Sequence, residues 1–228
     1  LGGNKIANKA LEFIGRNKKW SNLEELNLSS NLIEDGGITH LGKCFSWKNL
    51  KLLNLAMNQI SDKGITKISS NTTWRRLESI DLTKNSIGDK GAAELARNTV
   101  WTDLKLLLLG SNQISDDGAA SIGRNKAWTK LEELCLSNNH IKDRGAVGIG
   151  ANVSWLRLKS LDLSDNRIGD IGAEAIGMIR IWRNLEELML NGNNIGDKGA
   201  VGIGRNIYWK NLRILNLSEN RIGDQGAT

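Results

Sequence analysis

The chain of 228 residues carries 31 lysine and arginine residues against 25 aspartate and glutamate residues, which gives a formal net charge of +6. None of its apolar runs approaches the roughly 20 residues that cross a bilayer, and no signal-peptide pattern is present, so we expect no membrane partner. Proline is absent and no low-complexity run interrupts the sequence, which argues against linkers and for one continuous array.

Tryptophan recurs at every 27th position, and this period organises the whole chain. All eight tryptophans obey it: Trp20, Trp47, Trp74, Trp101, Trp128, Trp155, Trp182 and Trp209. Asparagine keeps the same phase at nine positions: Asn4, Asn31, Asn58, Asn85, Asn112, Asn139, Asn166, Asn193 and Asn220. A fixed period of this length predicts a solenoid of stacked strand and helix units. We call residues at equivalent places in successive units a column, and we expect the tryptophan column to be buried.

Each unit is predicted to open with a short strand that follows its tryptophan. These strands begin at Leu23, Leu50, Leu77, Leu104, Leu131, Leu158, Leu185 and Leu212, with the spacing LxxLxL. Their second residues alternate in charge: Glu24, Lys51, Glu78, Lys105, Glu132, Lys159, Glu186 and Arg213. Neighbouring parallel strands would place these opposite charges side by side, worth about 0.2 to 1 kcal/mol for each exposed pair.

A loop and a helix follow each strand. The asparagine column lies in the loop, where an amide can donate and accept together, so we expect a ladder of side-chain to backbone hydrogen bonds. Asp197 and its equivalents are predicted to cap the helices, and a small residue at the position of Gly204 is predicted to let neighbouring helices approach closely. Asn206 is predicted to end its helix in the left-handed conformation.

The exposed side of the strands supplies the candidate binding residues. Leu108 is apolar in a column that is otherwise Asn27, Asn54, Asp81, Cys135, Asp162, Met189 and Asn216. Leu106 lies on the same face by strand alternation. We therefore predict a partner-binding patch of Leu106, Leu108, Cys135 and Met189 with an acidic rim of Asp81, Glu132, Glu133 and Asp162. Drift at unselected positions, or cover by a further segment of a longer chain, would equally explain the apolar residues.

The charge is predicted to divide between the two faces. The five strand and loop columns facing away from the core carry 11 acidic and 5 basic residues, whereas the rest of the chain carries 26 basic and 14 acidic residues. We therefore expect an acidic strand face, suited to a protein partner with a basic surface and an apolar anchor. Nucleic acid would be the partner of the basic helix face, through Arg97, Arg124 and Arg205, but a solvated helix face is the simpler interpretation.

Residues for catalysis or metal binding are not grouped in the sequence. His40 and His140 lie far apart with no second ligand at zinc spacing, and the aspartate column offers one carboxylate a unit where calcium needs six to eight oxygens. We therefore expect no enzyme activity, no cofactor and no small-molecule substrate. Cys44 and Cys135 occupy different columns and should not pair, which favours a reducing, cytoplasmic compartment.

The unit LEELMLNGNNIGDKGAVGI resembles the leucine-rich repeats, and specifically their ribonuclease-inhibitor-like class, although the units here share one length that is shorter than is usual there. The resemblance implies an α/β fold: a right-handed solenoid bent into an arc, with a parallel β-sheet on the concave face and α-helices on the convex face. Residues 1 to 228 would form a single array of eight near-complete units and a partial N-terminal one, cut from a longer chain. The resemblance also implies a protein-binding scaffold, located in a host cytosol if the chain is a bacterial effector. The alternative within the fold class is a GTPase-activating protein of the Ran type.

Overall fold

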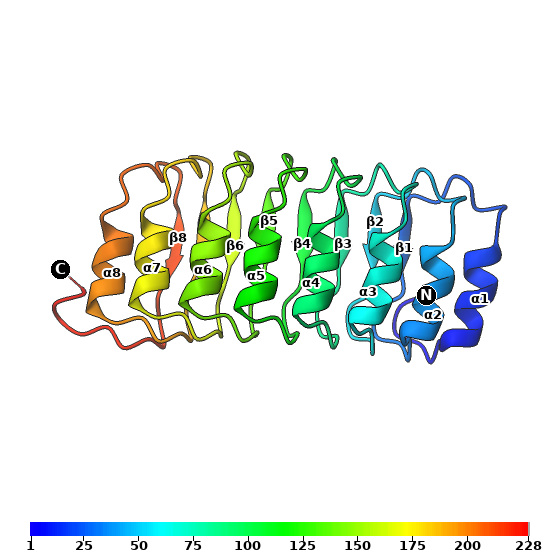
Figure 1. Cartoon of the computed structure of the whole chain (residues 1–228), viewed down its shortest axis with the longest axis horizontal. Helices are drawn as coiled ribbons and strands as arrows, with labels where there is room; N and C mark the ends of the chain where they lie inside the picture. The colour runs from blue at the N-terminus through cyan, green and yellow to red at the C-terminus, as the bar shows by residue number, and fades with distance from the viewer. Residues whose placement is uncertain (228) are drawn as a thin grey trace.

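The computed structural model describes residues 1–227 and alternates helices with strands along its whole length (Figure 1). The helices are α1 Asn8–Arg16, α2 Asp35–Gly42, α3 Asp62–Ser69, α4 Asp89–Ala96, α5 Asp116–Gly123, α6 Asp143–Gly150, α7 Asp170–Gly177 and α8 Asp197–Gly204. The strands are β1 Glu25–Asn27, β2 Leu52–Asn54, β3 Ser79–Asp81, β4 Leu106–Leu108, β5 Glu133–Cys135, β6 Ser160–Asp162, β7 Glu187–Met189 and β8 Ile214–Asn216.

The eight strands form one parallel sheet in sequence order, and each strand pairs with the next at equivalent positions of successive units, so that Leu26 lies opposite Leu53. The middle residue of each strand from β1 to β7 is buried beneath the helices, and its two neighbours point to the other side. We call that outer side the sheet face. Helices therefore cover one side of the sheet only, which confirms the predicted fold class (Figure 1).

The core is built from columns of equivalent side chains. In the tryptophan column, Trp209 is 8% exposed and six members are fully buried: Trp47, Trp74, Trp101, Trp128, Trp155 and Trp182. The predicted burial is therefore confirmed for these seven, whereas Trp20 in the first unit is 40% exposed. The indole N–H of each of the seven buried tryptophans has no acceptor among the described residues, so these side chains stabilise the fold by packing rather than by hydrogen bonding.

The predicted asparagine ladder is present and joins consecutive units. Asn58 Oδ1 accepts from the backbone N–H of Ile33, 3.1 Å away in the preceding unit, while its Nδ2 donates to the carbonyls of Leu28 and Leu55, each at 3.0 Å. The other members except Asn4, which bonds only to Leu1 and Gly2 nearby, repeat these bonds; Asn166, for example, accepts from Ile141 and donates to Leu136. Each buried amide therefore satisfies backbone groups of two units that water cannot reach.

The aspartate column caps helices, but not the helices to which the aspartates belong. Asp35, the first residue of α2, accepts through Oδ1 from the N–H groups of Ser61 (2.8 Å) and Gly64 (3.0 Å) at the start of α3. Asp62 does the same for Gly88 and Gly91. The aspartates therefore cap helices as predicted, but the prediction named the wrong helix, because each aspartate caps the helix of the following unit.

The helix-ending asparagines are not left-handed, and this prediction is wrong. Asn17 has φ −75°, and the positive φ angles fall instead just before the ladder asparagines, at Ser30, Met57, Lys84, Ser111, Asn138, Asp165, Gly192 and Glu219. The helix-ending asparagines form a second ladder: Asn71 Nδ2 donates to the carbonyls of Gly42 and Cys44, each at 3.0 Å, and its Oδ1 accepts from the N–H of Thr73 at 2.8 Å. The carbonyls at the end of a helix are thus satisfied by the following unit.

Small residues at the position of Gly204 do bring neighbouring helices together, as predicted. A Cβ added at Gly123 would lie 2.1 Å from the carbonyl oxygen of Gly148 on α6, and one at Gly177 would lie 2.2 Å from that of Gly202 on α8. No such contact surrounds Gly204 itself, which has no later helix beside it in the described structure. These close approaches leave no room for a side chain.

Candidate functional site

The sheet face places most of the predicted binding residues in one row. Strand register sets Asp81 beside Leu108, Leu108 beside Cys135, Cys135 beside Asp162 and Asp162 beside Met189, on five consecutive strands from β3 to β7. Leu106 and Glu133 are likewise neighbours, one row closer to the start of the strands. The structure therefore brings these seven residues together on one surface.

Leu106 and Leu108 are half-buried rather than fully exposed, because the neighbouring strands crowd their side chains. Leu107 between them is fully buried in the core, as strand alternation requires. Each leucine therefore keeps part of its apolar surface in water, where a partner could cover it.

A groove on the sheet face extends this apolar surface toward the N-terminal strands. It encloses about 310 Å³ over β1 to β4, and Leu52, Ser79, Asp81 and Leu108 are among the residues that line it. Leu52 is 39% exposed and was missed by the sequence reasoning, which compared only the column of Leu108. The column two residues earlier in each strand contained the evidence, because Leu52 and Leu106 are apolar there whereas their neighbours are Glu25, Ser79 and Glu133.

The polar members of the Leu108 column have a local structural task. Asp81 and Asp162 each accept through Oδ1 from the N–H two residues later, that of Thr83 at 3.0 Å and that of Ser164 at 2.9 Å. Asn27, Asn54 and Asn216 make the same turn. Leu108 has no acceptor to offer, so this position gives up a turn-stabilising hydrogen bond in favour of an apolar side chain.

The acidic part of the patch is a group of like charges. Burial raises the pKa of the Glu133 carboxyl above its usual range, and the carboxylates of Glu187 and Asp162 raise it further. Burial likewise raises the pKa of the Cys135 thiol, which contacts the hydroxyl of Ser137 at 3.2 Å and a carboxylate oxygen of Asp162 at 3.5 Å. Cys135 is therefore a neutral thiol held by hydrogen bonds rather than a reactive thiolate.

Glu132 at the patch margin is paired within the sheet. The ammonium of Lys159 lies 2.7 Å from its Oε2, and the same geometry joins Lys51 to Glu24 and Lys105 to Glu78, each at 2.8 Å. The hydrogen bond that Lys159 donates to Glu132 also raises the pKa of Lys159. Three of the four alternating pairs thus form ion pairs. Within residues 1–227, the carboxylates of the patch that no ion pair neutralises are those of Glu133, Asp81 and Asp162, with Glu187 beside them.

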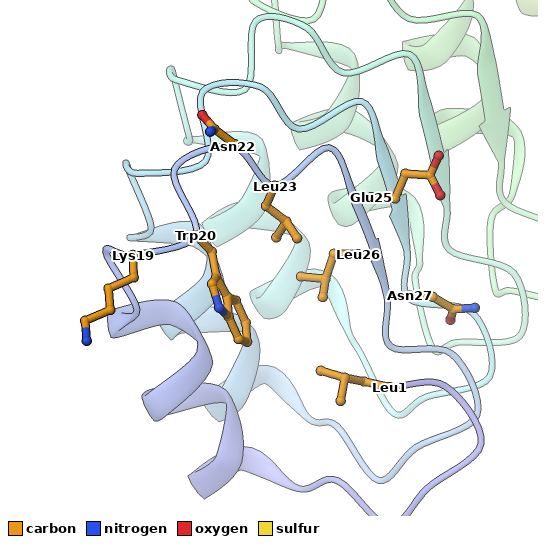
Figure 2. A pocket seen from close by; sticks show the side chains of 8 residues that line it. All are labelled: Leu1, Lys19, Trp20, Asn22, Leu23, Glu25, Leu26 and Asn27. Carbon is orange, nitrogen blue, oxygen red and sulfur yellow. The ribbon is translucent and has the colours of Figure 1, made fainter.

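A second pocket, of about 570 Å³, lies at the N-terminal end of the array, where Trp20, Leu23 and Leu26 line it beside Leu1 (Figure 2). The equivalents of the first three in the next unit, Trp47, Leu50 and Leu53, are buried almost completely. This pocket is therefore the core surface on which a neighbouring unit stacks elsewhere in the array.

Residues 1–227 contain no group of three or more histidine, cysteine, aspartate or glutamate side chains placed to hold a metal ion. Across the same range, every helix is too short or too polar to cross a membrane.

The parallel sheet, the helices on one side and the asparagine ladder define a strand and helix solenoid. A family model described as Leucine Rich repeat matches residues 21–42, 48–69, 75–96, 102–123, 129–150, 158–177, 183–204 and 210–228. The chain belongs to the leucine-rich repeat family. The more specific assignment to the ribonuclease-inhibitor-like class remains an interpretation of the repeat pattern.

Solved structures share this fold at low sequence identity. A plant ice-binding protein matches with a TM-score of 0.53 and 17% identity over 90% of this chain and 59% of its own. The Arabidopsis receptor kinase HAESA, solved in complex with a peptide hormone and a co-receptor, matches with a TM-score of 0.54 and 22% identity over 89% of this chain and 30% of its own. The chain thus spans less than two thirds of either protein. A search of curated protein sequences found no match.

Proposed function

We propose that this chain is a non-enzymatic protein-interaction module that binds a protein partner on its acidic sheet face. The observation that carries the proposal is the partly exposed apolar surface of Leu52 and Leu108, which line the groove over β1 to β4, together with Leu106 on the same strand as Leu108. Apolar surface flanked by polar groups on a rigid sheet favours an interaction site. Membership of the leucine-rich repeat family and the fold shared with a peptide-binding receptor kinase support the same general function.

The chemistry of the patch selects the kind of partner. An aliphatic or aromatic anchor would cover Leu106 and Leu108, and lysine or arginine side chains around it would face Glu133, Asp81 and Asp162. Cys135 and Met189 continue the row as polarizable contacts that adapt to an anchor's shape. The anchor would supply most of the affinity, whereas the charges would mainly set the rate and orientation of encounter.

We further propose a cytoplasmic setting for this interaction. Cys44 is buried and Cys135 is half-buried, and both are free thiols in the structure. Thiols that persist unpaired are typical of reducing compartments. In this proposal, residues 1–228 form a single array that binds the partner.

Leu108→Asn provides a sharp test, because asparagine stands at this position in three other units. The amide would accept from the N–H of Gly110, as Asn54 accepts from Ala56 at 2.9 Å, so the melting temperature should not fall. The variant nevertheless removes the apolar side chain at the centre of the patch. We expect Leu108→Asn to weaken peptide binding by at least about 30-fold, the size of an interface hot spot.

Random peptides displayed on phage and selected on the parent protein alone supply the ligands for this measurement. Selected peptides should combine an apolar anchor with flanking lysine or arginine. Glu219→Gln, on the loop beyond β8 and away from the groove, serves as the control and should bind them as the parent does. Peptides that bind Leu108→Asn as tightly as the parent, or that are predominantly acidic, would contradict the proposed site.

A further inference from the structure

One edge of the solenoid carries at least one basic residue in every unit and is strongly basic as a whole. It consists of the turns that lead from each helix to the next strand, residues 16–22, 43–49, 70–76, 97–103, 124–130, 151–157, 178–184 and 205–211, and we call it the helix-to-strand edge. These segments carry 16 basic residues and one acidic residue, Asp103. The segments of the opposite edge, residues 29–36 and their seven equivalents, carry 8 basic and 12 acidic residues. The excess positive charge of the chain is therefore concentrated on one edge.

The basic side chains of this edge face solvent. Fifteen of the sixteen are exposed, and the remaining one, Lys130, is half-buried and lies 2.6 Å from Asp103. The only acidic side chain of the edge is thus already neutralised. Arg16 and Arg97 pair with Glu12 and Glu94 of their own helices, but Lys126, Arg157, Arg183 and Lys210 form no ion pair among the described residues.

Helix dipoles account for only part of this charge. Basic residues at the ends of helices offset the partial negative charge of the last carbonyls. Five of the sixteen occupy that place: Arg16, Lys43, Arg97, Arg124 and Arg205. The other eleven lie beyond the helix ends in the turns, where they have no helix-capping task.

Bulky apolar side chains project from the same edge. Val153, Met178 and Ile207 are each 66% exposed, Phe45 is 57% exposed and Leu156 is 55% exposed. None of them completes the core, which the tryptophan and leucine columns fill. Val153 follows Asn152 and Ile207 follows Asn206, so two of these side chains stand at equivalent places two units apart, with Arg180 between them.

The turns that make up this edge lie along one side of the array, in the upper part of Figure 1, from the end of α1 to the end of α8. Basic side chains from all eight segments, and these exposed apolar side chains from four of them, therefore lie along one continuous edge that an extended surface could contact. A compact partner would reach only two or three units.

We propose that the helix-to-strand edge binds the surface of an anionic lipid bilayer. Lysine and arginine would contact the negatively charged headgroups, and Phe45, Val153, Leu156, Met178 and Ile207 would enter the interfacial region. Nucleic acid fits less well, because single strands are held mainly by aromatic stacking and duplexes mainly by phosphate contacts, whereas the projecting apolar side chains of this edge are largely aliphatic. Contact of the lipid surface needs no membrane-spanning helix, but it departs from the expectation of no membrane partner that we drew from the sequence. It is also independent of the sheet-face interaction, which involves other residues.

Sedimentation with vesicles tests the proposal. The protein should pellet with vesicles of phosphatidylcholine mixed with phosphatidylserine and stay in solution with vesicles of phosphatidylcholine alone. Combining Lys126→Gln, Arg157→Gln, Arg183→Gln and Lys210→Gln should lower the binding constant on the order of several hundredfold, about fivefold for each basic side chain. Combining Val153→Ser and Ile207→Ser should weaken binding while leaving its salt dependence unchanged.

The matched control carries the same loss of charge on the opposite edge, as Lys63→Gln, Lys90→Gln, Arg167→Gln and Arg221→Gln, all at exposed positions. This control should bind mixed vesicles within a few-fold of the parent. Equal losses in the two charge variants, no sedimentation of the parent with mixed vesicles, or full binding by the Val153→Ser and Ile207→Ser variant would each overturn the proposal. Tighter binding to duplex RNA than to mixed vesicles, unchanged in that last variant, would assign the edge to nucleic acid instead.

Discussion

Single residues on the sheet face carry opposing requirements of stability and recognition. Leu108 replaces a turn-forming asparagine or aspartate, and Glu133 holds a carboxylate where burial and two other carboxylates oppose its ionisation. In Glu133 the conflict is electrostatic and depends on pH. It can therefore be measured without knowing any partner.

Glu133→Gln should stabilise the protein at neutral pH. A carboxyl whose pKa is raised by folding binds its proton more tightly in the folded state, so its ionisation weakens the fold. Its stabilising contribution is present below the unfolded pKa, near 4.5, and is lost as the pH rises through the higher folded value. The gain in melting temperature from Glu133→Gln should therefore be largest near pH 7 and should shrink as the pH falls below about 4, where the Glu133 carboxyl becomes protonated in the folded and the unfolded state alike.

Glu132→Gln is the matched control for this measurement, because its carboxylate is paired with Lys159 rather than crowded by acids. Removing it should leave stability at neutral pH unchanged or slightly lower. A loss of stability in Glu133→Gln at neutral pH would mean that its neighbours do not repel it.

The helices of residues 1–227 depend on neighbouring units for their stability. Seven of the helices have only eight residues, too few for independent stability in water. The N–H groups that open α5 are bound by Asp89 of the preceding unit, and the carbonyl of Ala96 at the end of α4 is bound by Asn125 of the following one. Helix ends are therefore satisfied by side chains of neighbouring units.

Asp89→Ala should lower the free energy of unfolding by about 1 to 2 kcal/mol, the usual cost of a lost helix cap. Asp89 accepts from the N–H groups of Ser115 (2.7 Å) and Gly118 (2.9 Å), and alanine leaves both without a partner. Urea denaturation would measure the change. Asp117→Ala, which removes an exposed carboxylate of α5 paired with Arg144, should cost less than about 1 kcal/mol. Equal costs for the two variants would argue against capping between units.

The sequence predicted the units, the phase, the buried tryptophans and the asparagine ladder, because each follows from periodicity and side-chain chemistry. It could not say which helix each aspartate caps, since a bond within one unit and a bond to the next join the same two columns. Residues 34 and 61 are equivalent, so only the rise of the coil decides that Asp35 binds Ser61. The half-burial of Leu106 and the groove beside Leu52 depend on how side chains of neighbouring strands pack in three dimensions. The residue types in a single column do not determine that packing.

The array combines two sequence periods, one of a single unit and one of two units. The backbone repeats with every unit, whereas the charge pairs of the sheet repeat with every second unit. The shorter period defines the fold, and the longer one keeps like charges apart. Removing one unit or two units therefore has different consequences.

Deletion of residues 104–130 should leave a folded protein, because β3 and β5 then meet in the same phase. The deletion also places Glu78 beside Glu132, and this repulsion should make the melting temperature rise with added salt more steeply than that of the parent. Circular dichroism would follow both properties. Deletion of residues 104–157 places Glu78 beside Lys159 and should lack the extra salt dependence. Loss of cooperative unfolding in the shorter deletion alone would show that the pair of units, rather than the single unit, is the smallest stackable piece.

The capping of each helix by side chains of the two neighbouring units also determines which units open most easily in the folded state. An interior unit that opened alone would expose its own helix and also strip the aspartate cap from the following helix and the asparagine cap from the preceding one. Three units would lose hydrogen bonds in one event, whereas an outermost unit breaks contact on a single side. In an isolated polypeptide of residues 1–228, opening should therefore start at the two outermost units and travel inward, so that the backbone amides of α4 and α5 exchange with solvent most slowly. The sheet-face groove, which begins at β1, would then combine a flexible margin with a floor that is among the most rigid parts of the molecule.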